Sequence, residues 1–358
     1  MPPTVHKALL EGAPGGFGTR TRAMRMSFAA TGLLLALSAL PAAAQSGVAY
    51  GPELEGFDYP YPVGRFDFTS QRQPLHMAYM DVKPEQANGR TIVLLHGKNF
   101  CGATWEGVIA PLTKAGYRVV VPDQIGFCKS SKPQDYQFSL HQLAANTHAL
   151  LAQLDVEKPI IMGHSMGGML AIRYALTFPQ DLSGLVLVDP IGLEDWREKG
   201  VPSLTVDQWL VGEQRNNFQG MKKYQQNTYY AGTWKPEYDK WVDMLAGMYL
   251  GAGKDKVAYD QALTSDMLLS QPVVHELHNI KAPTLLLIGM KDNTAIGKAA
   301  APADVQKRLG NYPELGKAAA KAIPGATLVE FADLGHAPQI QDPAAFNAAL
   351  LKGLDLMK

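Results

Sequence analysis

The chain has 358 residues, of which 46% are apolar and 18% are charged, so it is long enough for one large domain with an insertion and too apolar to remain disordered. Its 33 basic residues balance its 33 acidic residues, which gives a formal net charge of zero. A nucleic-acid-binding surface needs an excess of basic residues. We therefore expect no nucleic-acid partner.

The amino terminus has the three parts of a secretory signal. An apolar run at residues 28–40 ends in a small-residue cleavage site and is too short for a typical membrane span. Three arginines precede it: Arg20, Arg22 and Arg25. We predict that residues 1–44 are removed, leaving a periplasmic or secreted chain without membrane attachment; an uncleaved anchor is the alternative. Residues 1–23 fit no signal design, so Met24 or Met26 is an alternative start.

The rest of the chain alternates between strand and helix patterns. Residues 65–69 and 75–82 alternate like half-exposed antiparallel strands. Short continuous apolar runs, typical of parallel strands buried on both faces, occur at 92–95, 119–121, 160–162, 185–188 and 285–288. Helix-patterned stretches such as 140–154 and 169–178 lie between them. This order predicts an α/β fold with a doubly wound, mostly parallel sheet.

One serine lies where a predicted strand meets a predicted helix. The sequence Gly-His-Ser-Met-Gly, with the serine at Ser165, follows the apolar run at 159–162 and opens the helix at 169–178. A sharp turn at this place directs the serine hydroxyl into a cleft and leaves room only for small residues on either side. Gly-x-Ser-x-Gly alone is a weak pattern, but the strand and helix around it make Ser165 a candidate nucleophile.

The two partners that such a serine needs occur downstream, in the order Ser, Asp, His. Asp292 follows the strand predicted at 284–288, and His336 follows the strand predicted at 327–331. An imidazole can take the serine proton and return it to the leaving group, while an aspartate orients the ring. Each residue alone suits a helix cap or a surface, but three at strand ends predict a catalytic triad. An acid after the preceding strand, Asp189 or Glu194, is the alternative.

A further loop supplies the expected oxyanion donors. His96, Gly97 and Lys98 follow the strand predicted at 91–95. A tetrahedral intermediate needs two backbone N–H donors, each worth about 3 kcal/mol. We expect the N–H groups of Lys98 and Met166 to form this oxyanion hole.

These motifs resemble those of the α/β-hydrolase superfamily from about residue 63 to the end. A turn at 123–130 is similar to the family's D-x-x-G-x-G-x-S turn, although Cys128 replaces its second glycine. The resemblance implies a serine esterase-like enzyme with a helical cap, without cofactor or metal. A serine at the nucleophile position, Ser165, argues against an epoxide hydrolase or a haloalkane dehalogenase of this fold, because those enzymes use a carboxylate nucleophile. His275 and His278 have a metal-like spacing, but no carboxylate or thiolate converges on them in the sequence, so we interpret them as solvated helix residues.

The strand–helix alternation is interrupted at residues 194–280, which hold four of the five tryptophans. We predict a helical cap here. Each ring alone suits the core of the cap, but together they exceed what it needs to bury, so some are expected to form an apolar binding wall. The expected substrate-binding residues are His96, His164, Trp209, Tyr229, Tyr230 and Trp234. A second irregular stretch, at 293–322, is expected to add a helix to the rim.

The chain has only two cysteines. Cys101 follows the oxyanion loop, and Cys128 lies in the turn after the next strand. In the family's strand order these two strands are neighbours, so the resemblance implies that the loops can touch. Export favours a disulfide, which would close a loop of about 27 residues and contribute roughly 3–4 kcal/mol by the chain-entropy argument. Two buried, inert thiols are the alternative.

The predicted organisation is a signal at 1–44, a hydrolase core at 45–193 and 281–358, and a cap at 194–280. We expect an exported serine hydrolase that cleaves a carboxylic ester through an acyl-enzyme, because an alkoxide leaves more readily than an amine. The alternatives are a lactone or macrolide-ester hydrolase, an amidase, a proline iminopeptidase-like peptidase and, outside the enzymes, an inactive ligand-binding member of the fold. The expected partner is a small-molecule ester, and the expected state is a monomer or small homo-oligomer.

Overall fold

The structure is a computed structural model that describes residues 47–357. The predicted signal at 1–44 therefore lies outside the described residues. Within the described part, no helix is both long and apolar enough to span a bilayer.

In the described residues, eight strands form a single sheet in the order β1-β2-β4-β3-β5-β6-β7-β8. The β1–β2 and β2–β4 pairs are antiparallel, and every other pair is parallel. The strand bounds are β1 Val63–Ser70, β2 Gln73–Val82, β3 Thr91–Leu95, β4 Arg118–Pro122, β5 Ile160–His164, β6 Gly184–Val188, β7 Thr284–Gly289 and β8 Thr327–Phe331.

Burial explains the apolar runs from which the sheet was predicted. Every residue of β5, β6 and β7 is buried, because these central strands are covered on both faces. The edge strand β1 instead alternates between exposed and half-buried positions. The predicted α/β fold with a mostly parallel, doubly wound sheet is therefore confirmed.

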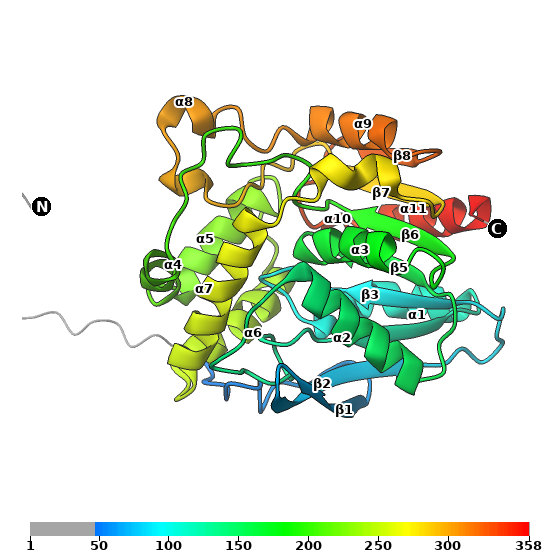
Figure 1. The fold of residues 1–358 in the computed structure, drawn as a ribbon, viewed down its shortest axis with the longest axis horizontal. Helices are drawn as coiled ribbons and strands as arrows, with labels where there is room; N and C mark the ends of the chain where they lie inside the picture. Colours follow the sequence, from blue (N-terminus) through cyan, green and yellow to red (C-terminus); the bar gives the residue numbers. More distant parts are fainter. Residues whose placement is uncertain (1–46, 358) are drawn as a thin grey trace, which may run out of the picture. The chain divides into compact units, whose positions relative to one another are not determined.

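Helices on the two faces of the sheet enclose two hydrophobic cores (Figure 1). One core includes buried residues of α2, α3 and α9, and the other includes those of α1 and α11. The bounds of these helices are α1 Glu106–Lys114, α2 Leu140–Gln153, α3 Met166–Thr177, α9 Tyr312–Ala322 and α11 Pro343–Leu356.

Four helices of the described chain, α4 to α7, lie between β6 and β7 in sequence and gather at one end of the sheet (Figure 1). Their bounds are α4 Val206–Glu213, α5 Phe218–Thr228, α6 Asp239–Leu250 and α7 Lys254–Ser270. A capping box at Thr205 and Gln208 fixes the start of α4. This helical insertion has the position predicted for the cap, and we refer to α4–α7 as the cap helices.

The stretch at 293–322 does not add its longest helix to the rim. That helix, α9, packs against β7 and β8, and its apolar residues Leu315 and Ala319 are buried. Gly316 lies directly against Ile288, so α9 belongs to the layer that covers the sheet. Only the segment before it, with the short helix α8 at Ala303–Gln306, lies beside the cap helices (Figure 1).

Candidate active site

Ser165 occupies a strained turn between β5 and α3. Its backbone has φ 55° and ψ −120°, a conformation that side-chain-bearing residues seldom adopt. A β-carbon at Gly163 would collide with the backbone of Gly167, and one at Gly167 would lie 2.7 Å from the carbonyl oxygen of His96. The two glycines are therefore required by close packing around the serine, as the motif predicts.

His336 and Asp292 form a buried pair at the ends of β8 and β7. The Nδ1–H of His336 donates to Oδ2 of Asp292 at 2.6 Å, and both side chains are fully buried. The second carboxylate oxygen of Asp292 accepts the Thr294 N–H at 2.8 Å. Among the described residues, His336 Nε2 has no hydrogen-bond partner. In this tautomer Nε2 carries no proton and is free to accept one.

His164 is buried and packs against His336. Its ring lies 4.9 Å from the ring of His336, and its Nε2–H donates to the His336 carbonyl oxygen at 2.7 Å. Burial, together with the nearby His336, lowers the pKa of His164 well below its usual range, so the ring stays neutral. The prediction that His164 binds substrate is therefore corrected.

His96 also has a structural role in place of the predicted contact with substrate. Its Nε2 accepts the Gln124 N–H at 3.0 Å, and its Nδ1–H donates to the Gly97 carbonyl at 2.9 Å. The side chain is buried, and burial lowers its pKa. His96 thus joins the loop after β3 to the turn after β4.

The loop after β3 crosses directly over the serine. A β-carbon at Gly97 would lie 3.0 Å from the β-carbon of Ser165, so this close approach requires glycine. Lys98 is the next residue, and Met166 is the first residue of α3, where backbone N–H groups lack helical partners. Among the described residues, neither of these two N–H groups donates a hydrogen bond. Both are therefore available to an oxyanion.

Asp189, at the end of β6, does not contact His336 by a hydrogen bond. Its Oδ1 accepts the Gly289 N–H at 2.8 Å. Burial and the neighbouring charge of Asp292 raise the pKa of Asp189 well above its usual range, which favours its protonated form. Glu194 accepts the Gly310 N–H and pairs with Lys199. The geometry therefore favours Asp292 over both alternatives as the acid.

The structure joins Cys101 and Cys128 in a disulfide, with 5.8 Å between their α-carbons. Cys128 has a φ of 48°, in the left-handed region that favours glycine. This conformation explains why the similar turn of the α/β-hydrolases has glycine here. The bond connects the end of the oxyanion loop to the turn after β4.

Removal of the disulfide is expected to lower the free energy of unfolding. Replacing both cysteines with alanine is expected to cost about 3–4 kcal/mol, because the loop of 27 residues is no longer closed in the unfolded chain. Cys101→Ala with Cys128→Gly is expected to cost about 1 kcal/mol less, because glycine accepts the positive φ. Urea unfolding of both variants measures the difference. Two free thiols in the native protein, detected by alkylation without reductant, would contradict the disulfide.

A pocket of about 550 Å³ lies between the cap helices and residues 293–300. Trp209 of α4 and Tyr224 of α5 contribute aromatic rings, and Ile296 faces them from the loop after Asp292. Lys98 and Asn99 of the oxyanion loop also line this pocket. The other lining residues are Leu204, Gln208, Gly212, Thr228, Ser265, Asn293, Thr294, Ala295, Gly297, Lys298, Ala299, Ala300 and Gln306.

Tyr229 connects this pocket to the catalytic residues. Its ring lies 4.9 Å from His336 and 5.3 Å from Tyr224, which lines the pocket. Its hydroxyl accepts a hydrogen bond from Asn99 Nδ2 at 2.8 Å. Tyr229 itself does not line the pocket, so its role in substrate binding stays a prediction.

Two of the predicted aromatic contacts belong to the interior of the cap. Tyr230 is fully buried and stacks on Tyr238 at 3.9 Å. Trp234 packs edge-on against both rings and donates its Nε1–H to Asp239. The prediction that Tyr230 contacts substrate is therefore corrected, because its ring is enclosed by other rings of the cap. Trp234 is half-buried and does not line this pocket, so its contact with substrate stays a prediction. Composition alone does not show which rings a cap packs against each other.

Sequence reasoning missed Asn99 and the loop at 293–300 as pocket residues, and it gave Tyr224 no site role. Tyr224 was one of several rings in the predicted cap, without a signal that separates it from Tyr230. Asn99 is adjacent to Lys98, so its place in the oxyanion loop could have been predicted from the sequence. Its hydrogen bond to Tyr229, 130 residues away, could not.

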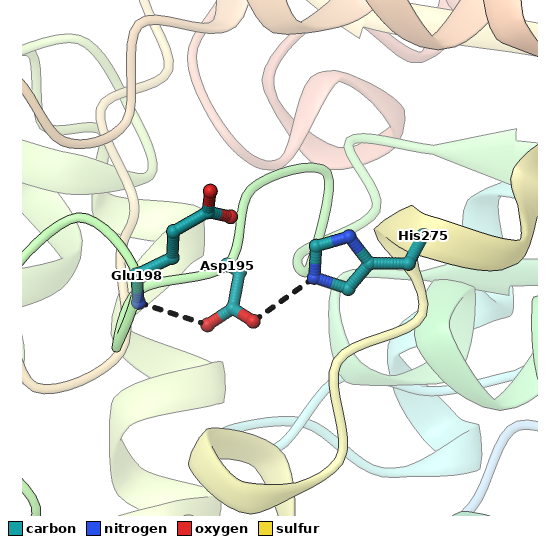
Figure 2. Close-up of side chains that lie close together, drawn as sticks. All are labelled: Asp195, Glu198 and His275. Carbon is teal, nitrogen blue, oxygen red and sulfur yellow. Dashed lines mark hydrogen bonds and ion pairs between the residues drawn. The ribbon is translucent and has the colours of Figure 1, made fainter.

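The two ends of the cap segment are joined by a side-chain cluster (Figure 2). Asp195, near its start, accepts hydrogen bonds from His275 Nε2 at 3.0 Å and from the Glu198 N–H at 3.3 Å. Burial raises the pKa of Asp195, but these bonds outweigh that effect and lower it. His275 thus pairs with Asp195 and not with His278. Asp195, Glu198 and His275 each present a ligand atom within 4.8 Å of the other two, so the expectation that no carboxylate converges on His275 is corrected. We refer to the hydrogen-bonded Asp195–His275 pair as the clasp.

Comparison with known proteins gives one family match and several relatives. The sequence model described as alpha/beta hydrolase fold matches residues 90–343. A probable hydrolytic enzyme from Pseudomonas aeruginosa PAO1 is similar over 86% of this chain and 99% of its own, with 62% identity and a TM-score of 0.85. Lipase 1 of Psychrobacter immobilis is 26% identical over 71% of this chain and 73% of its own.

Other curated relatives are matched over a shorter region. An uncharacterised protein of Mycobacterium tuberculosis is 38% identical over 106 residues, which are 30% of this chain and 30% of its own. The chain therefore spans about a third of the length of these relatives.

Proposed function

The chain belongs to the α/β-hydrolase family, and we propose that it is an exported serine hydrolase that cleaves a carboxylic ester through an acyl-enzyme at Ser165. The observation that carries this proposal is the juxtaposition at three strand ends. Ser165 follows β5 on a strained turn, and the ring of its neighbour His164 lies 4.9 Å from that of His336, which is paired with Asp292 and has a free Nε2. This arrangement has the residue types and the tautomer that nucleophilic catalysis by serine needs.

In the proposed reaction, the ester carbonyl binds with its oxygen towards the N–H groups of Lys98 and Met166. His336 Nε2 takes the proton of Ser165 as its hydroxyl attacks the carbonyl carbon, and Asp292 stabilises the resulting imidazolium. The two N–H groups stabilise the oxyanion. The imidazolium then protonates the departing alcohol, and the same steps with water release the acid and restore the serine.

Charge in the cap supports an ester over a peptide with a free amino terminus. A peptidase of that type needs a carboxylate to hold the substrate ammonium group. Three acids of the cap segment are candidates for binding such an ammonium group, but each is paired within the protein: Glu194 with Lys199, Asp195 with His275 and Glu213 with Lys98. The aromatic and aliphatic walls of the pocket suit an apolar acyl or alcohol group instead.

Two further observations support the proposal. The similar proteins include one described as a probable hydrolytic enzyme and one named a lipase, an enzyme class that cleaves esters. For export, the support is the signal-like pattern at 28–40 together with a disulfide between the chain's two cysteines, since disulfides persist in oxidising compartments.

A hydrolysis screen tests the proposed substrate class. The purified chain, residues 45–358, is assayed against p-nitrophenyl esters of increasing acyl length, γ- and δ-lactones, anilides and prolyl amides. We expect apolar esters to have the highest kcat/KM. Faster turnover of lactones, or of anilides and prolyl amides, would replace the ester assignment by the corresponding alternative. Absence of turnover together with tight binding of an ester would indicate a ligand-binding member of the fold.

The cap rings are expected to separate into selectivity and stability residues. Trp209→Ala removes a pocket wall, so it should change relative kcat/KM among esters by about tenfold, since a lost apolar contact costs roughly 1–3 kcal/mol. Tyr230→Ala removes a buried ring, so it should lower stability by about 3 kcal/mol and reduce all ester rates together. Rate profiles and thermal unfolding of both variants are compared. Uniform losses for Trp209→Ala would place selectivity elsewhere.

A further inference from the structure

Two adjacent residues of the oxyanion loop are bound by the cap. Lys98 Nζ forms an ion pair with Glu213 Oε1 at 2.7 Å, and Glu213 is the last residue of α4. Asn99 Nδ2 donates to the Tyr229 hydroxyl at 2.8 Å, and Tyr229 immediately follows α5. Both contacts join the core of the enzyme to its cap.

The carboxylate that holds Lys98 is itself fixed in place. Its Oε2 accepts Asn216 Nδ2 at 2.7 Å and the Tyr249 hydroxyl at 3.0 Å. The side chains of Lys98 and Glu213 are 13% and 11% exposed, so water screens their attraction only weakly. Burial and the Glu213 charge raise the pKa of Tyr249 well above its usual range, which keeps its hydroxyl a donor. Glu213 is therefore a rigid, preorganised anchor.

The anchored residues include the one whose backbone is the proposed oxyanion donor. On one side of Lys98, Gly97 lies against the β-carbon of Ser165, and on the other side Phe100 closes the turn through its N–H to the Gly97 carbonyl at 3.1 Å. Small shifts of a donor relative to the developing oxyanion reduce catalysis strongly. A shift of the cap would therefore move the Lys98 N–H relative to the oxyanion.

We propose that Glu213 and Tyr229 are positioning residues that hold the oxyanion loop in its catalytic geometry through Lys98 and Asn99. The inference rests on the proposed function and extends it: besides lining the pocket, the cap holds the loop that carries one of the two proposed oxyanion donors. A buried ion pair contributes little to stability on average compared with apolar residues of similar size. Because one partner of this ion pair, Lys98, lies on the oxyanion loop, we assign the pair to holding the Lys98 N–H in position.

The test compares turnover with binding of a transition-state analogue. Glu213→Gln keeps the size of the side chain and acceptors for Tyr249 and Asn216 but removes its charge, and Tyr229→Phe keeps the ring beside His336 but removes the hydroxyl. For each variant, kcat and KM are measured with the best p-nitrophenyl ester. The inhibition constant is measured for the matching trifluoromethyl ketone, which adds to the serine and places an oxyanion in the hole.

We expect kcat to fall about tenfold or more in each variant, with KM changed by less than about twofold. The inhibition constant of the ketone should rise by the same factor as kcat falls. The double variant Glu213→Gln with Lys98→Met, which leaves no unpaired buried charge, should show the same loss of kcat while retaining wild-type thermal stability. A loss that appears only in unstable variants would overturn the inference.

His275→Gln is the matched control. It breaks the clasp between the ends of the cap segment, which is another contact of the cap, without touching the oxyanion loop. It should leave kcat and ketone binding unchanged. Equal effects in His275→Gln and Glu213→Gln, or unchanged kcat in Glu213→Gln and Tyr229→Phe, would overturn the positioning role alone. A wild-type protein that neither hydrolyses esters nor binds the ketone would overturn the proposed function and this inference with it.

Discussion

Replacement of Ser165 by alanine is expected to lower kcat for ester hydrolysis by a factor of about 10⁶, since no other nucleophile can take its place on the turn. The fold should persist, because the Ser165 side chain makes no capping hydrogen bond to α3 and alanine tolerates the φ of 55° about as well as serine. Steady-state kinetics and thermal unfolding measure the two effects.

Ser165→Gly is a useful companion variant. Glycine relieves the strained φ, so this variant should be at least as stable as Ser165→Ala and equally inactive. Hydrolysis at the wild-type rate by either folded variant would refute the mechanism.

The second large effect is expected at the acid of the triad. Asp292→Asn should lower kcat by about 10⁴, because an amide cannot hold His336 in the tautomer that leaves Nε2 free and cannot stabilise the imidazolium. Asp189→Asn should retain most activity. Its pKa is raised, so its neutral form is favoured in the wild type, and the amide oxygen can accept the Gly289 N–H in the same way.

These two asparagine variants are near isosteres of the residues they replace, so the comparison controls for packing. Rates are measured from pH 6 to pH 9, a range in which a shifted histidine titration would also be seen. Near-normal activity of Asp292→Asn, with loss of activity in Asp189→Asn or Glu194→Gln, would show that the acid lies after β6.

The sheet could be predicted from the sequence because its central strands are buried on both faces. Runs such as Leu185–Val188 have no polar residue that would suggest another structure, and the observed β6 extends the run by one residue. Boundaries were less accurate where a turn is functional. The helix expected at 169 begins at Met166, because the strained serine itself ends the preceding turn.

The proposed catalytic residues could be selected from the sequence because each follows a strand, and the carboxyl ends of parallel strands meet at one edge of the sheet. The binding wall was harder to predict. Tyr229 and Tyr230 are adjacent in sequence, yet one packs on His336 and the other on Tyr238. Which ring faces the pocket depends on helix packing, and no local pattern records it.

Contacts between the cap and the oxyanion loop are also absent from local sequence. Lys98 and Glu213 are 115 residues apart, so no local pattern pairs them. Folding brings the two charges together and neutralises both. The sequence shows that Glu213 is present, but its burial and its partner Lys98 follow only from the tertiary structure.

The most direct test of the proposed mechanism is covalent labelling by a fluorophosphonate, which reacts with activated serine hydroxyls. The wild-type chain, residues 45–358, is incubated with the probe, and its intact mass and proteolytic peptides are measured; Ser165→Ala is treated in parallel. We predict one adduct per wild-type chain, located on Ser165, and none on the variant. An unlabelled wild-type chain, or an adduct on a different residue that persists in Ser165→Ala, would contradict the assignment of Ser165 as the nucleophile.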